Sequence, residues 1–423
     1  MKRFISILAF LVLSGSLLAG TPDTAAQRKA KALDGPGGIF EACNWGILAV
    51  NAKGDTIAKL NHKRRMVPAS NMKLITTGAA LLKLGGGYTF RTRIATDGEI
   101  RDSVLFGNLY IIGEGDPMLG ELFSYLPKPD RTFEQWGKII SDAGIKRIGG
   151  AIVGDGTHFA EEPYHEDWTR EDFESKDGVM PSGLCWRGRM DDSIPDGPLA
   201  AAIHFDEWLQ SHGVTVLGMP CAGSIPEEYL TELGRTFSPP LRSIVSITNH
   251  RSDNYSAELL LRELSLQTTG YDDYKHAIPA LHNALSPLGL ASESRKMHFV
   301  DGSGLSRKNY ISPDFMVKYL RAMARTGVYT DFHNSLPNPG RADGTLKPRL
   351  PEAGPATKNR IFMKSGSMNG IYCFSGYIDA PSGKARETVI FSVMVNNYVG
   401  PTNDMLRALD EVIAILADYN ASM

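Results

Sequence analysis

Apolar and polar positions along this chain predict three blocks, and the first of them lies near the N-terminus. Two β-rich runs from Cys43 to Leu60 flank the turn-forming segment Asn51 to Asp55, a pattern that predicts a β-hairpin. Apolar side chains coat nearly all sides of the next segment, which starts at Pro68 and ends at Gly85-Gly86-Gly87. This second pattern predicts a helix that lies inside the protein.

The C-terminal block is β-rich and then helical. Three runs joined by turn residues predict an antiparallel meander, at Arg360 to Ser365, Gly370 to Asp379 and Glu387 to Asn397. An amphipathic helix follows, with an apolar stripe from Met405 to Leu416. We expect the N-terminal hairpin and this meander to form one antiparallel sheet flanked by helices.

The middle of the chain has a different character. Its predicted strands and helices are Val104 to Ile112, Arg147 to Gly154, Phe133 to Ala143 and Leu199 to Ser211. This mixture predicts a large inserted α+β domain over residues 93–240. Residues 27–92 and 241–423 should then form a single domain around the predicted sheet, which gives a mixed α/β (α+β) fold.

The first residues predict a cleaved secretory signal. Lys2 and Arg3 precede an apolar run from Phe4 to Leu18, and the small residues Ala19-Gly20 follow. This run is short for a helix that spans a bilayer, which needs about 20 residues. We expect a signal over residues 1–20, with a cut as late as residue 26 still open, and a periplasmic protein without a membrane span.

Composition narrows the classes of function. The chain is 42% hydrophobic and 22% charged, as expected of a globular enzyme, and its formal net charge is -2. This balance gives no basis for nucleic-acid binding.

The cysteines leave the presence of disulfides open, and the histidines do not indicate a metal site. Disulfides can form in an oxidising compartment, and Cys185 with Cys221 is the more local pairing, but buried free thiols fit the sequence equally well. His158 and His165 flank Glu161-Glu162 without forming an HExxH helix, so we predict no metal and no cofactor. The four cysteines are Cys43, Cys185, Cys221 and Cys373.

The string Ser70-Asn71-Met72-Lys73 opens the predicted buried helix. A serine hydroxyl needs a base within hydrogen-bond reach, and side chains three residues apart share one helix face with Cβ atoms about 5 to 6 Å apart. Burial would lower the pKa of Lys73 and favour the neutral amine that accepts the Ser70 proton. Such a string also arises by chance about once or twice in a chain of this length.

A second string, Ser252-Asp253-Asn254, precedes a helical run from Ala257 to Leu264. These residue types are preferred helix caps, which is one interpretation. The other is catalytic: Ser252 relays a proton, and the Asn254 amide holds a backbone amide of the substrate.

The third string, Lys364-Ser365-Gly366, lies on a predicted edge of the meander. Gly366 lets another backbone approach closely, and Lys364 with the Ser365 hydroxyl could bind a terminal carboxylate. The backbone amides of Ser367 and Ser70 would then form an oxyanion hole. The alternative is a solvated lysine beside a β-bulge.

Together the three strings resemble the motifs of the penicillin-recognising serine transferase superfamily. Asp301 to Arg307 resembles a signature of the low-molecular-mass class C penicillin-binding proteins, the D-alanyl-D-alanine carboxypeptidase/endopeptidase family. Gly113 to Pro117 and Ile152 to Asp155 are also similar to segments of that family. An added domain in its members would explain the long gap between Lys73 and Ser252.

The resemblance implies roles for individual residues. Ser70, Lys73 and Ser252 take the catalytic places, and Asn254, Lys364, Ser365 and Gly366 take the substrate-binding places. Asp155 and Arg307 are implied to contact the zwitterionic end of diaminopimelate. Simpler interpretations of these two are a turn aspartate and a surface arginine. The stretch Trp168 to Arg189 departs from the family pattern.

The resemblance implies a periplasmic peptidoglycan hydrolase. Ser70 would attack the peptide bond after a penultimate D-alanine of a stem peptide, and β-lactams would acylate the same serine. A β-lactamase is the nearest alternative, but no glutamate between Ser252 and Lys364 has the class A spacing to an asparagine. Those glutamates are Glu258, Glu263, Glu293 and Glu352. A non-catalytic peptidoglycan-binding protein is a further alternative.

Overall fold

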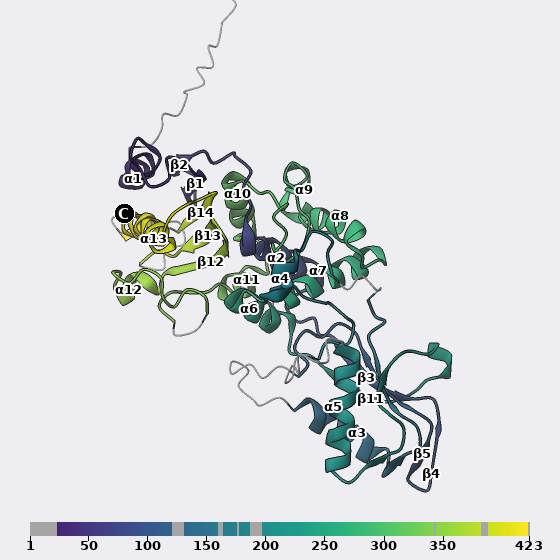
Figure 1. The fold of residues 1–423 in the computed structure, drawn as a ribbon. Helices are drawn as coiled ribbons and strands as arrows, with labels where there is room; N and C mark the ends of the chain where they lie inside the picture. The colour runs from purple at the N-terminus through teal and green to yellow at the C-terminus, as the bar shows by residue number, and fades with distance from the viewer. Residues whose placement is uncertain are drawn as a thin grey trace, which may run out of the picture.

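The computed structural model describes residues 23–120, 131–159, 164–175, 177–186, 197–341, 344–381 and 388–421. Both ends of the chain build a larger body, and the middle of the chain builds a smaller body beside it (Figure 1). The predicted signal over residues 1–20 lies outside the described residues. Within the described ranges, every helix is too short or too polar to cross a membrane.

The larger body is built on one five-stranded antiparallel sheet with the strand order β12-β13-β14-β1-β2. The predicted hairpin and the predicted meander are therefore confirmed as parts of one sheet, joined where β1 pairs with β14. Strand β12 lies at an edge. The strands are β1 (Asn44–Asn51), β2 (Thr56–Leu60), β12 (Ile361–Met368), β13 (Ile371–Ile378) and β14 (Val389–Asn396).

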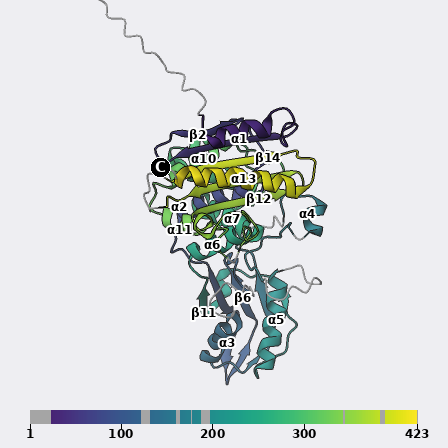
Figure 2. The same cartoon turned by 90° about the vertical axis from the view of Figure 1, so that its left-hand side faces the viewer.

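Alternating side chains of β1 supply two cores, one on each face of this sheet. Ile47 and Ala49 pack against α1 (Ala25–Asp34) and α13 (Thr402–Ala421), whereas Leu48 and Val50 face the remaining helices. Figure 2 shows α13 lying across the outer face of the sheet. A strand buried on both faces explains why its sequence is continuously apolar.

The opposite face of the sheet is covered by a helical layer around α2, which follows the 3₁₀ turn η1. Helix α2 is buried almost throughout and ends at Gly85, whose φ of 81° suits glycine, as the sequence predicts. The turn and the longer helices of this layer are η1 (Ala69–Asn71), α2 (Met72–Leu84), α6 (Leu241–Arg251), α7 (Asn254–Thr269), α8 (Tyr274–Ala284), α10 (Pro313–Met323) and α11 (Tyr329–Asn334). Short elements complete it: η3 (Ser286–Leu288), α9 (Ala291–Ser294) and α12 (Pro355–Lys358).

The smaller body holds two sheets, with the strand orders β10-β8-β6-β3-β11 and β4-β5-β7-β9. Its own core includes Trp136, Phe205 and Leu209 from two helices. Its strands are β3 (Arg91–Thr96), β4 (Glu99–Arg101), β5 (Val104–Phe106), β6 (Leu109–Gly113), β7 (Arg147–Ile148), β8 (Ile152–Asp155), β9 (Thr215–Val216), β10 (Cys221–Ala222) and β11 (Thr231–Phe237). Its helices are α3 (Thr132–Asp142), α5 (Gly197–Ser211) and the 3₁₀ turn η2 (Glu227–Tyr229), whereas the short α4 (Arg170–Glu174) from the same part of the chain lies beside the larger body (Figures 1 and 2).

Two predicted strands in this body are each divided between its two sheets. The predicted strand 104–112 breaks at Gly107-Asn108, and the predicted strand 147–154 breaks at Gly149-Gly150. The Gly150 amide donates to the Gly107 carbonyl at 2.9 Å, and a Cβ at Gly150 would lie 2.5 Å from that same oxygen. Glycine therefore permits the close crossing that ends both strands.

Strands β3 and β11 pair antiparallel, so the chain enters and leaves the smaller body through neighbouring strands. This arrangement favours the predicted domain division at residues 92 and 240, which remains a prediction. All four cysteines are free thiols, and Cys221 is exposed whereas Cys185 is buried.

Candidate active site

Ser70 lies in η1, immediately before α2, and it is half-buried. The Nζ atom of Lys73 lies 3.0 Å from Ser70 Oγ, so the structure brings this predicted pair together. The helix begins as a 3₁₀ turn rather than at Pro68, and Ala69 has a φ of 46°. A positive φ is unfavourable for alanine, so the backbone is strained directly beside the hydroxyl.

Lys73 is completely buried, and its amine contacts three oxygen atoms. Besides Ser70 Oγ, it donates to Asn254 Oδ1 at 2.6 Å and to the Ser303 carbonyl at 2.8 Å. Burial lowers the pKa of Lys73 to about 8, against the opposing effect of the nearby carboxylates of Asp301 and Glu258. Near neutral pH a useful fraction of this amine is therefore unprotonated and able to accept a proton.

The second string connects α6 to α7. Ser252 ends α6 in a left-handed conformation with a φ of 60°, and the Asp253 side chain caps α7 by accepting from the Ser256 amide at 2.9 Å. The cap interpretation is therefore confirmed for Asp253. The next residue, Asn254, is the one that accepts from Lys73, so the same string also brings a side chain to the amine.

The third string lies on the edge strand β12. Lys364 is completely buried, which contradicts the alternative of a solvated lysine, and its amine donates to the Ser365 carbonyl at 2.7 Å. Burial, and then the charge of Lys73, lower the pKa of Lys364 well below its ordinary value. The Ser365 hydroxyl donates to Thr345 Oγ1 at 3.0 Å, and Ser367 is exposed further along the strand.

Gly366 is where β12 meets the turn that carries the serine. A Cβ at this position would lie 2.6 Å from the Pro68 carbonyl and 3.0 Å from the Asn71 amide. The sequence predicts that glycine lets a second backbone approach here, and that backbone is η1. This contact sets the edge strand directly against Ser70.

Sequence reasoning missed the residues that complete the surroundings of Lys73. Ser303, whose carbonyl accepts from Lys73, belongs to the loop Asp301–Asn309, which contains the predicted glycine-rich signature. Glu258 accepts from the Ser303 amide at 2.6 Å and so holds that loop. The signature contains Asp301 and Ser303, but only the fold shows that Glu258 binds this loop.

The structure places Asp155 and Arg307 in different surroundings. Asp155 ends β8 and accepts from the Thr157 amide and hydroxyl at 2.8 and 2.6 Å. These contacts agree with the simpler interpretation of Asp155 as a turn aspartate. It lines a cavity of about 550 Å³ that His158 and Gln267 also line. Among the described residues, Arg307 is exposed and no hydrogen bond or ion pair joins it to Asp155. Their common contact with one ligand remains a prediction.

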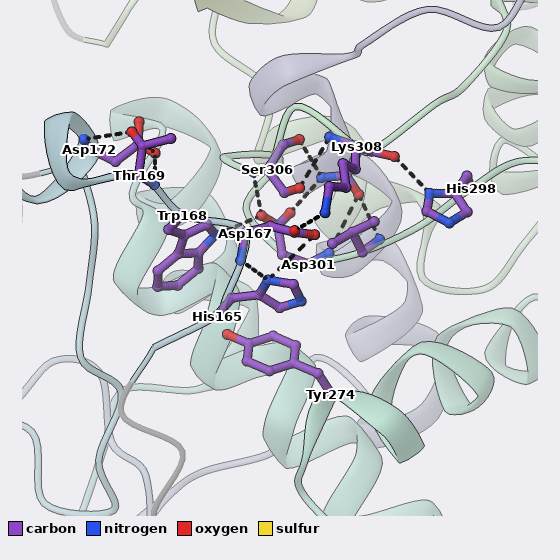
Figure 3. A network of polar contacts seen from close by, with 12 residues as sticks. His165, Asp167, Trp168, Thr169, Asp172, Tyr274, His298, Asp301, Ser306 and Lys308 are labelled. Atoms are coloured by element: carbon purple, nitrogen blue, oxygen red, sulfur yellow. Dashed lines mark hydrogen bonds and ion pairs between the residues drawn. The ribbon is translucent and has the colours of Figure 1, made fainter.

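The stretch that departs from the family pattern touches the site. Trp168 is buried, and its indole nitrogen donates to Asp301 Oδ2 at 3.0 Å, while Asp167 pairs with Lys308 on the same loop (Figure 3). The Asp177 carbonyl accepts from Asn254 Nδ2 at 2.8 Å. The segment around α4, which comes from the middle of the chain, therefore contacts the loop and the asparagine that surround Lys73.

Fold and site together define a class of protein. An antiparallel sheet flanked by helices, with Ser70 and Lys73 at the start of a buried helix beside a Lys-Ser-Gly edge strand, is typical of penicillin-recognising serine enzymes. The family model described as D-Ala-D-Ala carboxypeptidase 3 (S13) family matches residues 37–192 and 189–418. The chain belongs to this family.

Individual relatives extend over nearly the whole chain. The chain is 24% identical to a D-alanyl-D-alanine carboxypeptidase from an Actinomadura species, over 99% of this chain and 91% of the relative. It is also 24% identical to D-alanyl-D-alanine carboxypeptidase DacB from Haemophilus influenzae, over 85% of this chain and 86% of the relative.

Solved structures share the fold. Penicillin binding protein 4 (dacB) from Haemophilus influenzae has a TM-score of 0.76 at 21% identity, covering 94% of this chain and 98% of that one. A predatory peptidoglycan endopeptidase from Bdellovibrio bacteriovorus has a TM-score of 0.59 at 16% identity, covering 90% and 94%. The predicted penicillin-binding-protein fold with a large insertion is confirmed.

Proposed function

We propose that this protein is a serine-type D-alanyl-D-alanine carboxypeptidase with endopeptidase activity, and that Ser70 is its nucleophile. One observation carries the assignment of the nucleophile: a half-buried hydroxyl lies 3.0 Å from a completely buried amine whose pKa is lowered to about 8. A lysine in this condition can act as a general base. Membership of the family supports the reaction class.

The reaction follows from this pair. Ser70 Oγ attacks the carbonyl carbon of the penultimate D-alanine while its proton passes to Lys73 Nζ. The oxyanion would be stabilised by the backbone amides of Ser70 and Ser367. Ser252 relays the proton from Lys73 to the departing amine, the peptide bond breaks, and an ester to Ser70 remains. Water then hydrolyses the ester and restores the serine.

Lys364 and Ser365 are proposed to bind the terminal carboxylate of the substrate. Lys364 is completely buried, and in the described part of the chain its amine donates to the Ser365 carbonyl, while the charge that acts on its pKa is that of Lys73 and not of a carboxylate. Burying an ammonium without a counter-ion is costly, so a carboxylate that enters the site gains a strong partner. Asn254 is proposed to hold a backbone amide of the substrate, after its present bond to the Asp177 carbonyl is exchanged.

The names of the relatives support the proposed substrate and the proposed inhibitors. D-alanyl-D-alanine carboxypeptidase is the name of the Actinomadura relative, and penicillin binding protein 4 from Haemophilus influenzae has been crystallised in complex with a β-lactam. We therefore propose peptidoglycan stem peptides as substrates and β-lactams as covalent inhibitors of Ser70. The endopeptidase activity is proposed from the Bdellovibrio enzyme.

We propose export to the periplasm after removal of a signal that ends near residue 20. Helix α1 begins at Ala25, its cap Thr24 donates to the Ile57 carbonyl at 2.7 Å, and Ala26 is buried. Cleavage after residue 26 would remove this cap and the first helical residues, so the earlier cut fits the fold better. The mass of the mature protein tests this proposal.

The β-lactamase alternative needs a base that activates a deacylating water. Glu258 is the glutamate nearest the site, but it is fully buried and its oxygens accept from the Gly302 and Ser303 amides. It is therefore engaged in holding the loop. We expect a fluorescent penicillin to remain on Ser70 for many minutes, whereas a β-lactamase would release it within seconds.

The decisive experiment measures the release of D-alanine from a pentapeptide by the purified protein. Ser70→Ala is the control, because it removes the nucleophile without changing the helix. We expect release by the wild type and none by the variant. Binding to cell-wall sacculi without release by the wild type would instead favour the non-catalytic alternative. Mass spectrometry of digested muropeptides would show how much cross-link cleavage accompanies terminal trimming.

A further inference from the structure

Glu258 is a completely buried carboxylate in the second turn of α7. Its oxygens accept from the Gly302 amide at 3.1 Å and from the Ser303 amide at 2.6 Å. The Tyr274 hydroxyl of α8 donates to it at 3.1 Å. A charged acceptor that takes two consecutive backbone amides fixes the direction of the peptide between them.

The loop held in this way carries an acceptor for the base. The Ser303 carbonyl follows the amide that Glu258 binds, and it accepts from Lys73 at 2.8 Å. The next residue, Gly304, has a φ of 82°, and a Cβ there would lie 2.0 Å from the Ala69 carbonyl. The loop is therefore pressed against the residue that precedes Ser70, and a small displacement of it would move both partners of the proton transfer.

Asp301 holds the other end of the same loop. It accepts from the Gly304 amide at 2.7 Å and from the Ser306 amide at 2.6 Å, and the indole of Trp168, just before α4, also donates to it (Figure 3). Two buried carboxylates thus bind one short loop between them. Their local bonds differ: Glu258 binds the amide of Ser303 itself, whereas Asp301 binds the residues that follow.

We propose that Glu258 is a positioning residue for the lysine base: it fixes the Ser303 carbonyl on Lys73 and keeps a negative charge near the amine. This inference rests on the proposed function, because it assigns a purpose to Glu258 only if Lys73 accepts the Ser70 proton. Glu258 has no direct contact with the substrate in this scheme. It acts through the loop and through its charge.

The charges around this pair give the direction of the expected effect. Burial, and then the charge of Asp301, raise the pKa of Glu258 to about 7, while the charge of Glu258 raises the pKa of Lys73. Removing the charge of Glu258 should therefore lower the pKa of Lys73 further. The other titratable or charged groups that face the pair are Tyr274, Asp253, Asp177 and Lys364, with His165 and Arg262 around Tyr274.

The test measures the rate of acylation by a fluorescent penicillin as a function of pH, for the wild type and for Glu258→Gln. Glutamine keeps an oxygen for the two amides but removes the charge. We expect the acid limb of the profile to move to lower pH by roughly half a unit to one unit. An unchanged acid limb in Glu258→Gln would overturn the proposal.

The chain supplies a matched control on the same helix. Glu263 is also completely buried on α7, but it binds Tyr88 at 2.5 Å and His158 at 2.9 Å, away from the loop. Glu263→Gln should leave the acid limb at the wild-type pH. A shift of equal size there would also overturn the proposal, because any buried charge on the helix would then have the same effect.

A second variant tests the hydrogen bonds separately from the charge. Glu258→Ala removes the acceptor of both amides, and we expect the acylation rate at pH 8 to fall about 10- to 100-fold. A wild-type rate in this variant would contradict the positioning role. If the wild type carried no label on Ser70 at all, the proposed function itself would fail. A labelled wild type whose profile matches that of Glu258→Gln would overturn only the role of Glu258.

Discussion

The two buried lysines of the site, Lys73 on α2 and Lys364 on β12, have opposite surroundings. Both side chains are completely buried. Lys73 donates to three oxygens, and the charges of Glu258 and Asp301 act on it. Lys364 donates to a single carbonyl, and the charge that acts on it is that of Lys73. Lys73 is thus a base whose hydrogen-bond partners are all supplied by the protein. Lys364 is a cation whose carboxylate partner is supplied by the substrate.

The largest expected effect on acylation comes from replacing Lys73. Lys73→Met keeps the length of the side chain but removes the base, so we expect the rate of penicillin acylation to fall at least about a thousandfold. The variant also leaves the Asn254 and Ser303 oxygens without their donor, which should lower the free energy of unfolding by roughly 1 to 3 kcal/mol. Label formation and thermal unfolding measure the two effects. Wild-type labelling would remove Lys73 from the role of base.

Replacing Lys364 should affect stability and acylation differently. Lys364→Met removes a buried cation that lacks a carboxylate partner, so we expect the free energy of unfolding to be unchanged or higher. Acylation should fall about 10- to 100-fold, because the carboxylate of the penicillin loses a charge-assisted hydrogen bond. A substrate whose carboxylate is amidated should lose much less from the same substitution. Equal losses for both substrates would contradict the assignment of Lys364.

The pH dependence of acylation tests the surroundings of Lys73. Lys73 accepts a proton only when it is neutral, and burial lowers its pKa to about 8. The acylation rate should therefore rise about tenfold per pH unit below pH 8 and then level off. An ordinary lysine, with a pKa near 10.5, would give a rate that is still rising at pH 10. Stopped-flow measurement of penicillin acylation between pH 6 and pH 10 distinguishes the two profiles.

Much of this site can be predicted from the sequence, because short motifs encode local geometry. The spacing of Ser70 and Lys73 predicts their contact, and β-rich runs joined by turn residues predict the sheet that contains β12. The role of Gly366 as a site of close approach is also visible in the sequence, although the backbone it admits is that of η1.

Other features depend on contacts between distant segments. The contact of Glu258 with Ser303 joins a helix to a loop far along the chain, and no periodicity marks it. The role of Asp155 is implied by the family resemblance, and in the fold this residue begins a turn and lines a cavity with His158. The divided strands of the smaller body depend on Gly107 and Gly150 meeting across the structure, which a strand pattern cannot reveal.

The most direct test of the account is the position of the covalent adduct. The wild-type protein is incubated with a penicillin and digested, and the modified peptide is sequenced by mass spectrometry. We predict the mass of the penicilloyl group on Ser70, and none on Ser252 or Ser365. A stable adduct on another serine, or none on a folded protein, would contradict the central claim that Ser70 and Lys73 form the acylation site.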